Sequence, residues 1–243
     1  MDVLAIIGVL VGVIGISFAI YYGNKPSKVH EDSIKRIVEE IKSIKPHDAP
    51  ESLIKEIRIA AERITNPKTA PEHLLKGLAA EIDVNYEKAL RHYQNAIQLN
   101  PKYADAFLNM GRLYCEIGDY DNAIQSLHNA IQLKPNNADA YNFMGSAYYF
   151  KRKNDEAIQS FQNAIQLKPN FVQAYCGIGL TYNDAGKYKE AIQSFQKVID
   201  LNPDNANGYS AIAYDSMGLV FQKLGNQDKA KECFQKYEML KRK

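Results

Sequence analysis

One interval, 34 residues, recurs through most of this chain and constrains its fold more than any other feature. Alanine recurs at this interval at Ala123, Ala157 and Ala191. Four glycines and four prolines share the spacing: Gly77, Gly111, Gly145, Gly179, Pro101, Pro135, Pro169 and Pro203. Self-similarity at such a period is typical of helical repeat arrays, in which each repeat covers the apolar face of its neighbour. We therefore expect an all-α fold over residues 70–243.

Five repeats can be laid in register: 70–103, 104–137, 138–171, 172–205 and 211–243. Position eight of each repeat is glycine and position twenty is alanine, which lets the two helices of a repeat cross closely. Mostly large residues at positions four, eleven and 24 would fill the space beside that crossing. The proline at position 32 of the first four repeats cannot continue a helix and so ends the second one.

The pattern aromatic-x-x-apolar-Gly-x-x-Tyr, followed by Ala-x-x-x-Phe and a closing Pro, resembles the tetratricopeptide repeat family. The resemblance implies a right-handed superhelical array of five helix pairs and covers about seven tenths of the chain. Repeat 1 departs from the pattern on its first helix, where His73, Lys76 and Ala80 replace apolar and aromatic residues. Repeat 3 departs at Arg152, where its two neighbouring repeats have glycine.

In this family five positions of the first helix line a concave groove. Carried over by the resemblance, the candidate peptide-groove residues are Leu108, Arg112, Asp139, Asn142, Tyr149, Phe150, Leu180, Asn183, Asp184, Asp215 and Gln222. Over all repeats these positions hold six acidic and two basic side chains, which favours a basic or mixed peptide with an apolar anchor. Leu74, Leu78 and Leu108 stand where a clamp for a C-terminal carboxylate would need lysine or asparagine, so that binding mode is not implied. The alternative is a solvated concave face without a ligand.

Residues 3–22 form an uncharged stretch of twenty residues. As a helix they would span roughly 30 Å, the thickness of a bilayer core. We interpret residues 1–24 as a single-pass transmembrane anchor. A buried core helix fits poorly with so uniformly apolar a segment, and a cleaved signal peptide lacks a basic residue before the apolar run. Because the flanking lysines follow the stretch, the positive-inside rule predicts a cytoplasmic C-terminal domain.

Small residues line one face of this stretch: Ala5, Gly8, Gly12, Gly15 and Ala19. Such a seam lets two helices approach closely in lipid and predicts a homo-oligomer through the anchor. The alternative is that glycine and alanine are simply common in membrane helices.

Residues 25–69 connect the anchor to the repeats. Apolar residues at helical spacing predict two helices here, at about 31–44 and 51–65, which do not fit the 34-residue register. They are interpreted as a spacer pair that caps the first repeat; alternatively they pair with another copy or bind a ligand. Five extra residues, 206–210, predict that the first helix of the last repeat starts early, with a loop insertion as the alternative.

Nothing in the sequence points to catalysis. The five histidines have no metal-ligand spacing, no phosphate-binding glycine motif is present, and the three cysteines lack a patterned histidine. A net charge of +2 gives no support for nucleic-acid binding. We expect no enzyme, no cofactor and no metal, but a membrane-anchored scaffold that recruits a protein or peptide partner. Two rivals stay open: an oligomerising membrane effector whose repeats sense a signal or regulate the anchor, and a periplasmic assembly factor with inverted topology.

Overall fold

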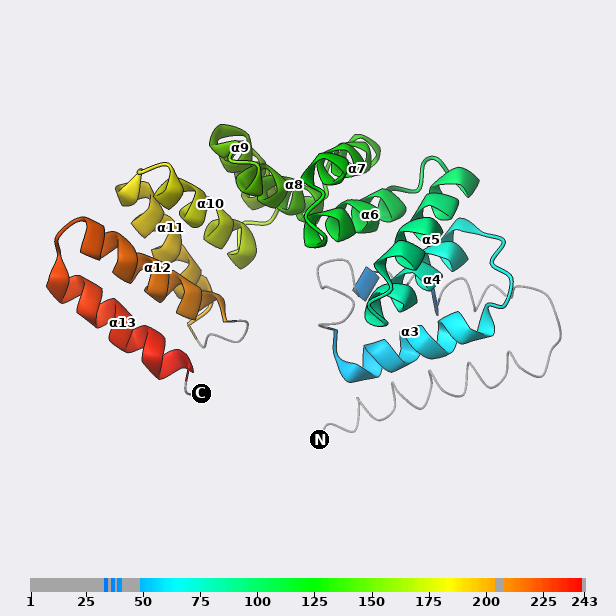
Figure 1. Cartoon of the computed structure of the whole chain (residues 1–243), viewed down its shortest axis with the longest axis horizontal. Helices are drawn as coiled ribbons and strands as arrows, with labels where there is room; N and C mark the ends of the chain where they lie inside the picture. Colours follow the sequence, from blue (N-terminus) through cyan, green and yellow to red (C-terminus); the bar gives the residue numbers. More distant parts are fainter. Residues whose placement is uncertain (1–32, 35, 38, 41–48, 204–207, 242–243) are drawn as a thin grey trace. The chain divides into compact units, whose positions relative to one another are not determined.

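The computed structural model describes residues 33, 34, 36, 37, 39, 40, 49–203 and 208–241. Over this part of the chain every regular element is an α-helix, and α3 to α13 are described from end to end (Figure 1). The predicted anchor, residues 1–24, and its seam at Ala5, Gly8, Gly12, Gly15 and Ala19 lie outside the described residues. Among the described helices none is both long and apolar enough to cross a bilayer. The contacts define two compact units, one ending at Asp105 and one beginning at Ala106.

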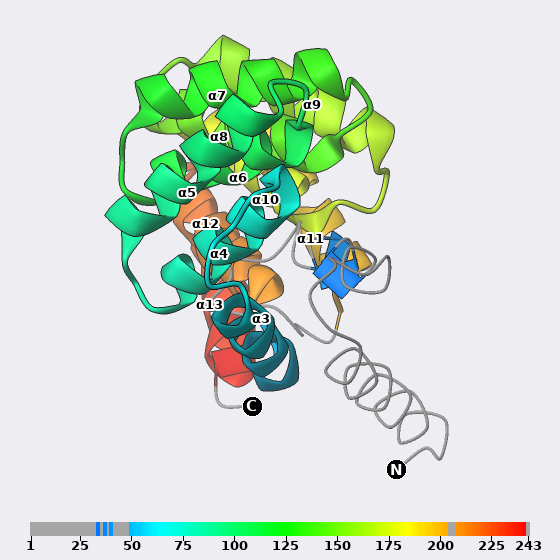
Figure 2. The same ribbon diagram turned by 90° about the vertical axis from the view of Figure 1, so that its right-hand side faces the viewer.

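The described helices form the five predicted pairs, preceded by α3 (Glu51–Arg63). The first helices of the repeats are α4 (Ala70–Ile82), α6 (Ala104–Glu116), α8 (Ala138–Phe150), α10 (Val172–Asp184) and α12 (Tyr209–Lys223). The second helices are α5 (Tyr86–Leu99), α7 (Tyr120–Leu133), α9 (Asn154–Leu167), α11 (Tyr188–Leu201) and α13 (Gln227–Lys241). Figure 2 shows the same helices after a quarter turn; α12 and α13, the two helices of the last repeat, pack against each other.

In the first unit, the connecting helix α3 packs against α4. The buried residues of α3 form one stripe: Leu53, Ile57 and Ala61. On α4, Leu74 and Leu78 are fully buried, so two positions that would line the groove in repeat 1 are covered. Pro67 lies 34 residues before Pro101, and α3 therefore occupies the chain position of a second helix in an additional repeat.

A buried polar contact joins the two helices of repeat 1. Position 24 is Tyr93 here, and its hydroxyl donates to Oε1 of Glu81 at 2.5 Å. Both side chains are fully buried, so this acidic residue lies in the core and does not line a surface. The start of α4 is fixed by a capping box between Thr69 and Glu72, which satisfies two backbone N–H groups that the helix leaves unpaired.

Within the second unit the glycine at position eight lets the helices of a repeat cross at close range. A Cβ atom at Gly145 or Gly179 would lie 2.8 or 2.7 Å from the ring of the position-24 phenylalanine of the same repeat. Such distances are shorter than carbon atoms tolerate, so glycine is required by packing. The four second helices α5, α7, α9 and α11 each end two residues before the position-32 proline.

The break in the period before repeat 5 lengthens its first helix. Helix α12 has 15 residues, against 13 in α10, and begins at Tyr209, two residues ahead of its position in register. Gly208 precedes it with φ 73°, a left-handed conformation that favours glycine. The predicted early start is thus present over two residues; residues 204–207 lie outside the described part.

Candidate functional site

The first helices of the second unit contact one another as well as their partners. Helix α10 touches both α8 and α12, so these three helices present neighbouring side chains. We call the exposed and half-exposed side chains that they share the first-helix surface: Asp139, Tyr149, Phe150, Leu180, Asn183, Asp184, Ile212, Asp215, Leu219 and Gln222. Eight of these ten residues belong to the groove candidates predicted from the sequence, so most of that prediction falls on accessible positions in the second unit.

Phe150 is the aromatic residue that stands out on this surface. Its side chain is 58% exposed at the end of α8, which is unusual for a large apolar group. The ring stacks on Tyr120 of α7 with centroids 5.2 Å apart and an interplanar angle of 9°. Tyr149 meets the same ring edge-on at 5.3 Å. Aromatic pairs of this geometry each contribute about 0.5–1.5 kcal/mol, so the exposed ring is held in a fixed orientation.

A polar cluster lies beside the aromatic rings. The Arg152 guanidinium donates from Nη1 to Oδ2 of Asp184 at 2.9 Å. Burial, together with the negative charge of the nearby Asp184 carboxylate, raises the pKa of Tyr149. One carboxylate of repeat 4 is therefore approached by two side chains of repeat 3, a phenol and a guanidinium.

The next contact along the surface joins repeats 4 and 5. Nζ of Lys223 donates to Oδ1 of Asn183 at 3.3 Å. The same ammonium group lies 5.5 Å from the ring centroid of Tyr188, within the range of a cation–π interaction. The amide of Asn183 is thus oriented by a residue of the following repeat.

Three groove candidates lie below the surface. Leu108 is 1% exposed and belongs to the core cluster of repeats 2 and 3. Arg112 is 2% exposed, with Nη2 3.5 Å from Oδ1 of Asn109 and Nη1 3.8 Å from Oε2 of Glu116. Asn142 is also buried, and among the described residues its Oδ1 has no hydrogen-bond partner. We leave all three residues out of the candidate contact surface.

Besides Ile212 and Leu219, two residues of this site were not among the groove candidates. Tyr120 starts a second helix, a region outside the five groove positions, and Arg152 lies in the connection between α8 and α9. The sequence did mark Arg152 as unusual, because the two neighbouring repeats have glycine at this position. It gave no indication of where the side chain would point.

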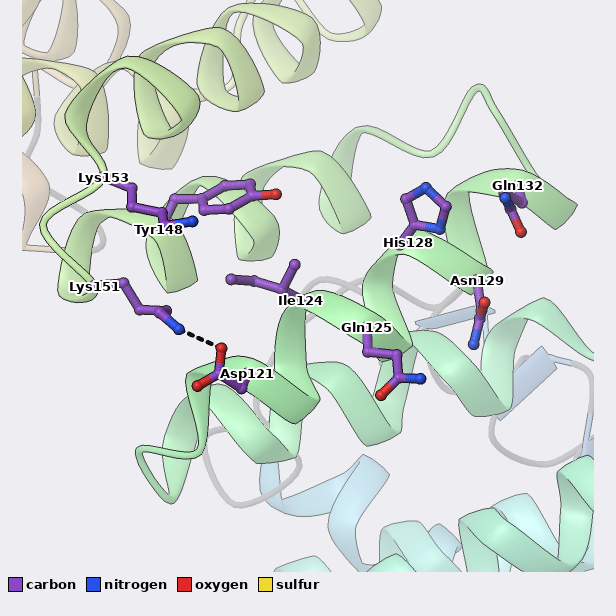
Figure 3. Close-up of a pocket in the computed structure, with 9 residues that line it drawn as sticks. All are labelled: Asp121, Ile124, Gln125, His128, Asn129, Gln132, Tyr148, Lys151 and Lys153. Atoms are coloured by element: carbon purple, nitrogen blue, oxygen red, sulfur yellow. Dashed lines mark hydrogen bonds and ion pairs between the residues drawn. The ribbon is translucent and has the colours of Figure 1, made fainter.

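A hollow of about 520 Å³ lies elsewhere on the second unit (Figure 3). Its lining comes from one face of α7 and from the end of α8 with the connection that follows: Asp121, Ile124, Gln125, His128, Asn129, Gln132, Tyr148, Lys151 and Lys153. Lys151 and Asp121 form an ion pair across it. The third charged group, Lys153, lies 3.8 Å from Glu156, so each charged group of the lining has an ionic partner. Three of the other lining side chains are amides: Gln125, Asn129 and Gln132.

The chemistry expected of a nucleophile or a metal centre has little support in the described part of the chain. No group of three or more His, Cys, Asp or Glu side chains is placed there to hold a metal ion. Burial raises the pKa of both Cys115 and Cys176 to about 12, which suppresses the reactive thiolate. These thiols act as small packing groups.

Comparison with known sequences identifies the repeats. Models described as "TPR repeat" match residues 85–116, 111–151 and 145–184. Models described as "Tetratricopeptide repeat" match residues 172–205 and 211–243. The matches start at residue 85 and so do not include α4, the helix that departs from the pattern. A search of curated proteins finds no match.

Solved structures give the same architecture. A crystal structure of MamA is 29% identical, covers 68% of this chain and 94% of its own, and has a TM-score of 0.63. The 41-end form of MamA from Desulfovibrio magneticus RS-1 is 20% identical over 78% of this chain and 95% of its own, with a TM-score of 0.62. YrrB, described as a TPR protein with an unusual peptide-binding site, is 22% identical over 76% of this chain and 91% of its own, with a TM-score of 0.58. The last two similarities show the fold alone. Since the family matches together span more than half of the residues, this chain belongs to the tetratricopeptide repeat family.

Proposed function

We propose that this protein is a membrane-anchored scaffold that recruits a protein or peptide partner through the first-helix surface of its second unit. The observation that carries the proposal is the exposed Phe150 ring, fixed by Tyr120 and flanked by Tyr149. Rigid exposed aromatic groups are the side chains that contribute most to protein interfaces. In YrrB, a structural neighbour, a peptide-binding site is described. We extend this mode of action, though not the position of that site, to the present chain.

The side chains around Phe150 favour a ligand that combines apolar and basic groups. Ile212 and Leu219 of α12 are more than two fifths exposed and supply apolar contacts. Asp139, Asp184 and Asp215 supply negative charge on the same three helices. Complementary charge steers association and fixes register, while buried apolar anchors supply most of the affinity. Binding of this kind acts by raising the local concentration of the partner.

A recruitment assay with matched variants tests the surface. The full chain would be crosslinked in its native membrane and its partners identified by mass spectrometry. We expect Phe150→Ala and Tyr149→Ala to lose the partner while circular dichroism stays unchanged. Leu167→Ala removes a comparable exposed apolar group at the end of α9 and should keep the partner. Recovery of every partner with both aromatic variants would show that the surface is wrongly assigned.

The membrane anchor is a proposal from the sequence, supported by the uncharged stretch at residues 3–22. The full chain should sediment with membranes and resist extraction by high salt, because its attachment is apolar. A variant lacking residues 1–24 should stay in the supernatant. A full chain that stays in the supernatant would rule out the anchor without touching the recruitment surface.

A further inference from the structure

The connection between the two helices of each repeat contains one residue with a left-handed backbone. Three of these residues are glycine: Gly118 (φ 82°), Gly186 (φ 74°) and Gly225 (φ 76°). The other two are Val84 (φ 56°) and Arg152 (φ 59°). A side chain is disfavoured in this conformation, because its Cβ atom approaches the following carbonyl oxygen. Repeats 1 and 3 therefore keep a strained residue where glycine would be relaxed, and such strain concentrates at functional sites.

Arg152 uses its strained position to reach into the next repeat. Its side chain is 77% exposed, whereas the side chain of its partner Asp184 is 30% exposed. Asp184 also lies close enough to Tyr149 for its carboxylate to raise the pKa of that phenol. The carboxylate is thus the less exposed member of the pair, and the arginine is an exposed side chain that lies over it.

We propose that Asp184, Tyr149 and Phe150 form a recognition site for an arginine side chain of the partner, and that Arg152 occupies Asp184 until the partner displaces it. This inference rests on the proposed function and names the chemistry of its ligand. A guanidinium pairs with a carboxylate through two parallel hydrogen bonds and stacks on aromatic rings, whereas a lysine ammonium does neither in the same way. The site offers a guanidinium the carboxylate of Asp184 and the aromatic rings of Tyr149 and Phe150. The protein's own Arg152 already pairs with that carboxylate.

Displacement of Arg152 costs little. Ion pairs between exposed side chains are weak, so an incoming arginine competes against a small free energy. Removing the internal arginine should tighten binding of an arginine ligand about two- to fivefold. The substitution Arg152→Gly also relaxes the left-handed backbone, so the variant should be at least as stable as the parent protein.

Fluorescence anisotropy with a defined probe tests this site. The probe is a fluorescein-labelled heptapeptide of alanine and leucine with one central arginine, and its two comparators carry citrulline or lysine instead. Citrulline keeps the shape of arginine and removes its charge. The full chain in detergent should bind the arginine probe most tightly, Arg152→Gly should bind it more tightly still, and Asp184→Asn should bind all three alike. Val84→Gly is the matched control, because it relaxes the same strain in repeat 1 and should leave every affinity unchanged.

The possible outcomes separate this inference from the proposed function. Equal or absent binding of the arginine and citrulline probes by both the parent protein and Arg152→Gly would overturn the arginine site. If Phe150→Ala still abolished partner recruitment in that case, the recruitment surface would stand with a different ligand. A preference for arginine that survives Asp184→Asn would also overturn the assignment, since the carboxylate would not be its source.

Discussion

The ring of Phe161 in α9 packs so closely on Gly145 in α8 that a Cβ atom at residue 145 would lie 2.8 Å from Cδ1. The ring cannot move away freely, because a Cβ atom at Gly177 of α10 would lie 2.4 Å from its Cζ. Phe161 thus joins two repeats through two glycines. Contacts of this kind recur with the 34-residue period and set the distance between neighbouring helices.

Gly145→Ala should therefore destabilise the second unit by about 1–3 kcal/mol, the usual cost of an added methyl group in a packed core. The sign is informative, because alanine is the better helix former by about 1 kcal/mol and would otherwise stabilise α8. Urea denaturation followed by circular dichroism measures the change. Ser146→Ala, at the next and more exposed position, should shift the midpoint much less. A Gly145→Ala variant as stable as the parent protein would contradict the close contact.

The helix pairs and their contacts could be predicted because the period aligns residues that meet in space. Glycine at position eight and a large residue at position 24 touch in each of the five repeats, so one alignment predicts this contact throughout the array. The connecting helix α3 could not be aligned with the 34-residue repeats for a physical reason. Its buried stripe is centred on Ile57, whereas Ile59, the residue 34 positions before Tyr93, is exposed. The helix itself was predicted at about 51–65, but the shift of two residues in its buried stripe kept it out of the 34-residue register, although Pro67 is in phase.

The candidate site was harder to predict. A position in a repeat indicates which way a side chain faces, but it does not indicate whether neighbouring residues bury that side chain. Leu108 and Arg112 have groove positions and yet are buried. Arg152 has no groove position and yet reaches Asp184 from a connection. Long side chains in connections depend on their three-dimensional neighbours, which a period cannot supply.

Ile57 tests whether α3 is an integral cap of the first repeat. Its side chain is fully buried, whereas Ile59 in the same helix is 38% exposed. Ile57→Ala should lower the stability of the first unit by about 2–5 kcal/mol, through lost burial and the cavity left behind. Hydrogen exchange followed by mass spectrometry should show faster exchange in both α3 and α4. Ile59→Ala removes the same side-chain atoms from the exposed face of α3 and should change the stability and the exchange rates little. Unchanged exchange in α4 with Ile57→Ala would favour the alternative in which α3 serves another partner.

The native cysteines should be poor reporters of topology. Burial raises the pKa of Cys115 and Cys176 to about 12, so the thiolate fraction at pH 7.5 falls about a thousandfold relative to an exposed thiol. Iodoacetamide should therefore label the folded protein slowly and the urea-unfolded protein quickly. Gln132→Cys places a thiol at an exposed position of α7 and should label at once in the folded state. That variant suits a test of the predicted cytoplasmic orientation, and rapid labelling of folded Cys176 would contradict its burial.

A histidine pair gives the first unit a dependence on pH. Nδ1 of His73 lies 3.0 Å from Nδ1 of His92, so one ring donates a hydrogen bond and the other accepts it. Two neutral rings can share this bond, and two protonated rings cannot. Burial lowers the pKa of both histidines, and for His92 to about 4, helped by the nearby charges of Lys88 and Arg91. Glu72 opposes the shift at His73.

Because the folded state holds His92 neutral down to about pH 4 while the unfolded chain takes up the proton near pH 6.5, stability should fall between these values as the pH is lowered. His92→Gln keeps a hydrogen-bonding side chain that does not titrate, so its loss of stability over this range should be smaller. Hydrogen exchange in α4 and α5, measured at several pH values and corrected for intrinsic rates, reports this unit separately. His128→Gln removes an exposed histidine of the second unit and should follow the parent profile. Parallel profiles for His92→Gln and the parent protein would show that the pair does not set the pH dependence.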